Sequence, residues 1–169
     1  VAGDRVAVLD GNRGETFALL FACAKLGAAL FQANWGLSQA ELDWQIGHST
    51  PKVILADPAN LDRVRRAVSL DEDPGSVRVS GGGWSAEQPW QLMYTSGSTG
   101  KPKGAMIPHR GICNRVLWMI DHLHLTPTDR LLQKTATTFD ASVWKFLAPL
   151  VVGAPVILAR PGGEQVPRP

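Results

Sequence analysis

The chain has 169 residues, enough for one ordinary domain, because a chain of this size buries roughly 70% of its unfolded surface. Hydrophobic residues make up 44% and charged residues 19%, and this balance excludes a disordered or collagen-like chain. A formal net charge of +2, spread over dispersed Lys and Arg residues, excludes the strongly basic surface of a nucleic-acid-binding protein.

Neither membrane insertion nor export is predicted. The longest apolar stretch, 16–31, is interrupted by Lys25 and is too short for a membrane span. No signal-peptide pattern follows Val1, so we expect a cytoplasmic protein without a membrane partner. Cys23 and Cys113 lie far apart without a CxxC spacing and are interpreted as buried, reduced thiols.

Strand-like and helix-like patterns alternate along the first 70 residues. In chain order they predict strand 5–9, a helix with apolar residues from 17 to 28, strand 28–32, helix 38–48, strand 52–56 and helix 60–68. Ser38 followed by Glu41 is a capping-box signature for the second helix. Pro51 prevents that helix from continuing.

The second half of the chain continues the alternation after an exposed connection within the domain, 71–89. The predicted elements are strand 90–94, a glycine-rich loop, strand 104–107, helix 111–122, strand 130–134, helix 141–151 and strand 155–159. Strands that alternate with helices predict an α/β fold whose sheet has parallel content.

The most informative segment runs from Thr95 to Gly104 and contains three glycines, four hydroxyl side chains and two lysines. Glycines let backbone N–H groups converge on phosphate oxygens, hydroxyls donate further hydrogen bonds, and lysine adds positive charge. The segment is not a P-loop, because Pro102 follows Lys101 where Ser or Thr is needed, and it contains no GxGxxG. A Gly/Ser-rich hairpin connection without a ligand is the alternative.

The same ten residues resemble the signature loop of adenylate-forming enzymes, which include acyl-CoA ligases and the adenylation domains of nonribosomal peptide synthetases. The resemblance implies that the loop binds the β- and γ-phosphates of ATP, with Thr95 also serving Mg²⁺ and with Lys103 and Thr95 as the catalytic pair. The implied nucleotide-binding residues are Thr95, Ser96, Gly97, Ser98, Thr99, Gly100 and Lys103. The implied reaction is attack of a substrate carboxylate on the α-phosphorus of ATP with release of pyrophosphate.

Segments 109–115, 132–135 and 139–144 resemble the adenylation domains of peptide synthetases in particular. The resemblance implies that Asp140 pairs with the α-ammonium of an amino acid and that Ala141 and Trp144 line the side-chain pocket. The amino acid would then be loaded onto the phosphopantetheine of a peptidyl carrier domain. A helix N-cap is the alternative role for Asp140. Segment 34–38 is instead closer to acyl-CoA ligases.

The resemblance further implies that residues 1–169 form a partial AMP-binding domain, truncated at both ends. The fold expected is an incomplete part of the large N-terminal subdomain of adenylate-forming enzymes, without the C-terminal subdomain. Such a piece is expected to be inactive alone and prone to association through uncovered sheet edges and apolar surface. An acyl-CoA ligase fragment and a non-catalytic nucleotide-binding or structural remnant are the alternatives.

Other prominent side chains are given no functional role. Those expected to be solvated are Arg63, Arg65, Arg66, His122, His124 and Lys145. Those interpreted as packing residues are Trp35, Trp44 and Trp118.

Overall fold

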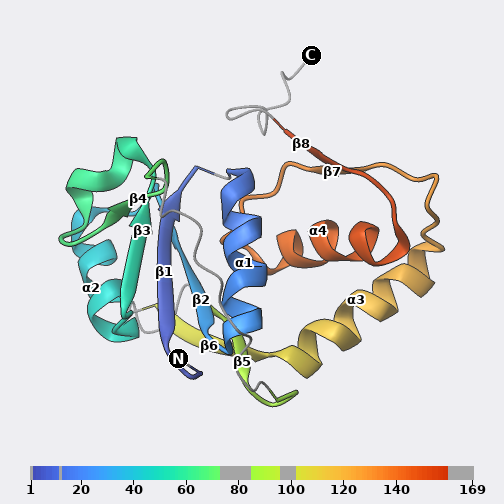
Figure 1. The fold of residues 1–169 in the computed structure, drawn as a ribbon, viewed down its shortest axis with the longest axis horizontal. Coiled ribbons are helices and arrows are strands. Elements are labelled where there is room, and N and C mark those ends of the chain that lie inside the picture. The colour runs from blue at the N-terminus through green and yellow to red at the C-terminus, as the bar shows by residue number, and fades with distance from the viewer. Residues whose placement is uncertain (1, 12, 73–84, 96–101, 160–169) are drawn as a thin grey trace. The chain divides into compact units, whose positions relative to one another are not determined.

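The computed structural model describes residues 2–11, 13–72, 85–95 and 102–159 (Figure 1). The chain divides into two compact units, Val1–His109 and Arg110–Pro169. Both units combine strands with helices, and this confirms the predicted α/β class.

The first unit contains a six-stranded sheet with the order β4-β3-β1-β2-β5-β6. Its strands are β1 (Arg5–Asp10), β2 (Ala29–Asn34), β3 (Val53–Ala56), β4 (Val68–Ser69), β5 (Pro89–Thr95) and β6 (Lys103–Pro108). Pairing is parallel from β4 through to β5, whereas β6 runs antiparallel to β5. The parallel strands are separated by longer connections, and the antiparallel pair is joined by a short one.

Two helices of the first unit follow β1 and β2 (Figure 1). Helix α1 (Gly14–Leu26) ends at Gly27, whose left-handed φ of 70° is the conformation that glycine adopts most readily. Helix α2 (Gln39–Ser49) begins with the predicted capping box, in which Ser38 and Glu41 satisfy each other's backbone N–H groups.

The core of this unit lies on both faces of the central strands. On one face Leu42 of α2 packs with Ala7, Leu9 and Phe31, all of them almost fully buried. Because side chains alternate along a strand, Val8 points to the opposite face, and it is also fully buried. Burial on both faces is the normal situation of a parallel sheet and explains the continuous apolar runs in the sequence.

The predicted helix 60–68 is wrong. Residues Pro58–Arg63 form a 3₁₀ helix, η1, and the chain then turns into β4, which pairs with β3. Arg63 at the end of η1 is held by long-range contacts, because its guanidinium donates to the Leu37 carbonyl at 2.6 Å and to the Trp35 carbonyl. Arg63 is therefore not solvated as expected, whereas Arg65 and Arg66 are exposed.

The second unit contains α3 (His109–Leu123), which starts at the last residue of the first unit, and the sequence β7 (Leu131–Gln133), α4 (Asp140–Val152), β8 (Val156–Leu158). Strands β7 and β8 pair in parallel, and α4 forms the crossover between them. Helix α4 ends at Gly153, again with a left-handed φ, 78°.

Cys23 is buried as predicted, and burial raises the pKa of its thiol to about 11. Cys113 is exposed, which contradicts the expectation of a buried thiol. The buried stripe of α3 follows Val116 and Met119 and continues at the half-buried Ile112, four residues before Val116, so Cys113 lies beside the stripe and not in it. Both cysteines are free.

The predicted histidine and tryptophan roles have mixed outcomes. His122 and His124 are exposed, as expected. Trp35 and Trp118 are not packing residues, with 57% and 49% of their surface exposed, and Trp118 stacks on His122 instead. None of the helices in the described part of the chain is long and apolar enough to cross a membrane.

Candidate functional site

Strands β5 and β6 form an antiparallel hairpin that brings the two ends of the predicted phosphate-binding loop together. Tyr94 pairs with Gly104, and Thr95 pairs with Lys103 at the tip. Both Thr95 and Lys103 are exposed there, so a hydroxyl and an ammonium face solvent at adjacent positions. The remaining predicted nucleotide contacts lie outside the described residues: Ser96, Gly97, Ser98, Thr99 and Gly100.

Gly104 lies in a closely packed part of the hairpin. A Cβ atom at this position would lie 3.1 Å from Leu92 Cδ1 and 3.3 Å from Tyr94 Cε1. These distances are shorter than ordinary carbon–carbon contacts, which lie at about 3.5–4.0 Å. The last glycine of the motif therefore accommodates the side chains of its own hairpin.

The Tyr94 side chain connects the hairpin to α2 and to the core. Its hydroxyl lies 2.7 Å from Nδ1 of His48. Its ring lies edge-on to Phe31 at 5.0 Å and to Trp44 at 5.9 Å between centroids. Trp44 is thus a packing residue, as predicted. Burial raises the pKa of Tyr94, so its hydroxyl remains protonated at neutral pH.

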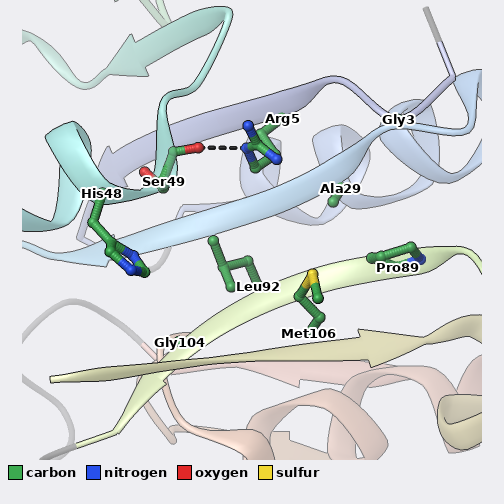
Figure 2. A pocket seen from close by; sticks show the side chains of 9 residues that line it. All are labelled: Gly3, Arg5, Ala29, His48, Ser49, Pro89, Leu92, Gly104 and Met106. Atoms are coloured by element: carbon green, nitrogen blue, oxygen red, sulfur yellow. Dashed lines mark hydrogen bonds between the residues drawn. The ribbon is translucent and has the colours of Figure 1, made fainter.

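A cavity of about 250 Å³ lies behind the hairpin, against the end of α2 (Figure 2). It is lined by Gly3, Arg5, Ala29, His48, Ser49, Pro89, Leu92, Gly104 and Met106. In Figure 2 the Arg5 guanidinium donates to the backbone carbonyl of Ser49, and it also reaches Thr50 Oγ1 at 2.7 Å. The volume lies below the roughly 300–1,000 Å³ of typical ligand pockets, so this cavity does not account for nucleotide binding.

In the second unit the predicted substrate-binding residues share the first turn of α4. Asp140 is the first residue of the helix and is exposed, while Ala141 and Trp144 are half-buried. Their spacing of three places Ala141 and Trp144 on one face of the helix. The N-cap residue is Phe139, which makes no side-chain cap bond, so the alternative role of Asp140 as N-cap is wrong.

Lys145 is not the solvated residue that the sequence analysis predicted. Its ammonium donates to Thr135 Oγ1 at 2.9 Å and lies 5.9 Å from the centroid of the Trp144 ring. It therefore connects the segment that follows β7 to the first turns of α4. A cation near an aromatic face adds a favourable electrostatic contact.

Comparison with known proteins decides the family of the chain. The family model for "AMP-binding enzyme" matches residues 1–168. The chain belongs to the AMP-binding enzyme family. It is 33% identical over 165 residues to vanchrobactin synthetase VabF of Vibrio anguillarum and 32% identical over 171 residues to enterobactin synthase component F of Escherichia coli K12. These matches cover 94% and 98% of this chain but only 6% and 13% of the two relatives.

The AMP-binding enzyme fold is also present in solved structures. The nonribosomal peptide synthetase FmoA3 in its AMPPNP-bound form superimposes with a TM-score of 0.84 and 24% identity, covering 95% of this chain and 18% of that chain. The α-methyl-L-serine-AMP bound form of FmoA3 superimposes with a TM-score of 0.82 and 25% identity, covering 95% and 19%. The superpositions establish the fold, and the predicted resemblance to adenylate-forming enzymes is confirmed.

The carboxyl edge of the parallel sheet is a common ligand site in α/β proteins, but here its polar groups serve the fold of the AMP-binding unit. Asp10 is 5% exposed and accepts hydrogen bonds from the Thr16 hydroxyl and, at 3.1 Å, from the Arg13 backbone N–H. Asn34 Oδ1 accepts from the Gly36 backbone N–H at 2.9 Å. Asp10 and Asn34 each organise the turn that follows their own strand. Thr95 ends the parallel strand β5 at the same edge and is exposed, so the candidate site lies there.

Sequence reasoning missed Tyr94, His48 and Lys145. Tyr94 directly precedes the signature loop, and this position was the available signal. His48 lies 46 residues from Tyr94, so nothing in the local pattern relates the two. Lys145 lies next to the recognised Trp144, but a lysine in the interior of a helix is usually solvated.

Proposed function

We propose that this chain provides the phosphate-binding hairpin and the amino-acid-binding helix of an adenylation domain. In the proposed reaction a carboxylate oxygen of an amino acid attacks the α-phosphorus of ATP. The bond from the α-phosphorus to the bridging oxygen breaks, and pyrophosphate leaves with the electron pair. Catalysis of this kind depends on positioning and on neutralising charge that develops on the phosphates.

The hairpin tip supports the nucleotide part of the proposal. Thr95 and Lys103 are paired and exposed at the ends of a loop that is rich in glycine and hydroxyl residues. The ammonium of Lys103 suits a phosphate oxygen, and the hydroxyl of Thr95 is a hard oxygen ligand of the type that Mg²⁺ prefers. Mg²⁺ bound there would neutralise part of the phosphate charge. Ser96, Ser98 and Thr99 would donate further hydrogen bonds.

Asp140 carries the amino-acid part of the proposal. It is an exposed carboxylate that caps no helix, placed in the same helical turn as the half-buried Ala141 and Trp144. A carboxylate in this position can pair with an α-ammonium group, and a fatty or aryl acid offers it no cation. The similarity to FmoA3, whose bound α-methyl-L-serine-AMP joins an amino acid to AMP, favours the same substrate class.

We also propose that residues 1–169 act as one part of a larger adenylation domain, because the chain spans only a small share of its relatives. The activated amino acid would then pass to the phosphopantetheine thiol of a peptidyl carrier domain. A mixed anhydride between a carboxylate and AMP is a reactive acyl donor, and a thiol nucleophile suits it. The carrier domain is proposed as a partner because the chain resembles peptide synthetases.

The test is amino-acid-dependent ATP–pyrophosphate exchange by the full-length polypeptide that contains residues 1–169. Asp140→Ala is expected to reduce exchange at least a hundredfold and leave nucleotide binding intact, because breaking a carboxylate–ammonium pair that the bound substrate shields from water costs about 3–5 kcal/mol. Asp121→Ala, which removes another exposed carboxylate of the second unit, is the matched control and should exchange normally.

Two other outcomes of this test would support the alternative functions. Exchange that is driven by fatty or aryl acids and is insensitive to Asp140→Ala would assign the chain to acyl-CoA ligases. A wild-type protein that binds no nucleotide would leave only a structural remnant.

A further inference from the structure

We propose that Tyr94 and His48 form a latch that holds the phosphate-binding hairpin in place, so that Tyr94 is a positioning residue for ATP. The inference rests on the proposed function and extends it to two residues outside the signature loop. Neither side chain is proposed to touch the nucleotide. Both act through the position of Thr95 and Lys103.

The first observation is that the hairpin pairs with its neighbouring strand over a short stretch only. Strand β5 pairs with β2 only through Leu30 with Gln91 and Phe31 with Leu92. Strand β6 is the edge of the sheet, with β5 as its neighbour among the described strands. Beyond Leu92, ladder hydrogen bonds therefore join the two arms of the hairpin to each other and not to the rest of the sheet.

The second observation is that Tyr94 attaches the unpaired end of the hairpin to the body of the unit. Its ring meets Phe31, which is fully buried, as well as Trp44 and His48 on α2. Its hydroxyl shares a hydrogen bond of 2.7 Å with Nδ1 of His48. Thr95 follows directly in sequence, so any displacement of Tyr94 displaces the start of the phosphate-binding loop.

The third observation is that the partner of Tyr94 is itself fixed. The His48 ring stacks on Trp44 at 4.9 Å between centroids, with an interplanar angle of 13°. The adjacent end of α2 is bound to β1, because Arg5 donates to the Ser49 carbonyl and to Thr50 Oγ1 (Figure 2). The hydrogen bond from Tyr94 thus ends on a rigid part of the molecule.

Gly104 completes the latch from the other arm of the hairpin. It faces Tyr94 across the antiparallel ladder, and a Cβ atom there would approach the tyrosine ring to 3.3 Å at Cε1 and 3.4 Å at Cζ. A side chain at position 104 would push the ring away from His48 or push Lys103 away from Thr95. Gly47 offers a matched control, because it lies next to His48 and a Cβ there meets nothing within 4 Å.

The experiment measures the KM for ATP, the KM for the amino acid and kcat of pyrophosphate exchange in the full-length polypeptide that contains residues 1–169. Tyr94→Phe removes the hydroxyl and keeps the ring, and His48→Ala removes its exposed partner with little risk to folding. Each is expected to raise the KM for ATP about threefold to tenfold, the equivalent of one lost hydrogen bond, and to leave the KM for the amino acid unchanged. Gly104→Ala is expected to raise the KM for ATP further. Gly47→Ala is expected to leave both KM values and kcat unchanged.

A double variant separates the latch from a general loss of stability. If the two side chains act through one hydrogen bond, Tyr94→Phe combined with His48→Ala raises the KM for ATP no more than either single change. Additive effects, or a Tyr94→Phe variant with an unchanged KM for ATP in an active enzyme, would overturn the latch alone. A wild-type protein without nucleotide binding would overturn the proposed function and the latch with it.

Discussion

At the scale of single residues, the side chains that organise the turns around the sheet are as informative as those at the site. Asp10 is buried at the end of β1, where it accepts two hydrogen bonds from the start of the next helix. Burial raises the pKa of its carboxyl, and the nearby Asp57 adds to the effect. Burial thus disfavours the charged form of this carboxyl, while its oxygen satisfies two hydrogen-bond donors.

Replacing Asp10 separates these two effects. Asp10→Ala leaves both donors without an acceptor and is expected to lower the free energy of unfolding by about 1–3 kcal/mol. Asp10→Asn retains an acceptor oxygen and removes the charge, so at neutral pH it should be at least as stable as the wild type. Urea unfolding of the purified chain measures both.

The pH dependence has a defined sign. The pKa of Asp10 is higher in the folded than in the unfolded chain, so the folded state binds more protons. The contribution of this carboxyl to the free energy of unfolding therefore falls as pH rises. The advantage of Asp10→Asn over the wild type should therefore grow between about pH 4 and pH 7. An advantage that shrinks over this interval would contradict the assignment.

At the scale of elements, the join between β2 and β5 contains an unusual polar pair. The Gln91 side-chain amide donates to Gln32 Oε1 at 2.8 Å, and both side chains are buried. This bond crosses the short parallel contact that connects the hairpin to the sheet. A buried polar pair adds little net stability, but it penalises any strand register that separates the two groups.

A double-mutant cycle tests this role. Gln91→Leu alone leaves the buried Gln32 without its donor and should cost about 1–3 kcal/mol of unfolding free energy. Gln32→Leu together with Gln91→Leu should recover most of that loss, because no buried polar group is then unmatched. Loss of stability that is simply additive in the double variant would show that the two amides do not act as a pair.

The same scale shows how far the sequence predicts the fold and the site. Period and capping residues predicted the strand–helix alternation and a strand on each side of the signature loop, whereas the antiparallel pairing of these two strands was not predicted. The failures coincide with tertiary contacts: where a helix was expected, Arg63 of η1 binds carbonyls of residues that precede it by 26 and 28 positions. Lys145 and Tyr94 likewise bind residues 10 and 46 positions away in the sequence, and no local sequence pattern indicates such contacts.

At the scale of the whole molecule, each unit exposes apolar side chains on strands at the edge of a sheet. Met106 on β6 is 70% exposed, and Ile157 on β8 is 45% exposed. Strands β7 and β8 form a sheet of two strands among the described residues, so each has an outer edge of unpaired backbone groups. Such edges bind other strands readily.

We therefore expect the purified chain of 169 residues to self-associate as its concentration rises. Met106→Lys and Ile157→Lys should each weaken the association, since a charged edge residue opposes strand addition. Val151→Lys is the matched control, because Val151 is 61% exposed but lies on a helix. Sedimentation velocity measures the outcome, and a wild-type chain that stays monomeric at all concentrations would contradict the expectation.

The glycine opposite Tyr94 has a consequence for how insertions and deletions are tolerated. A slip of β6 by one residue against β5 would place Lys103 or Ala105 opposite the tyrosine, and both carry a Cβ atom, which at this position makes contacts shorter than ordinary ones. The same slip would turn every β6 side chain to the other face of the sheet. Gly104 therefore favours the observed register of the hairpin, and an insertion or deletion within either arm would misalign the two strands.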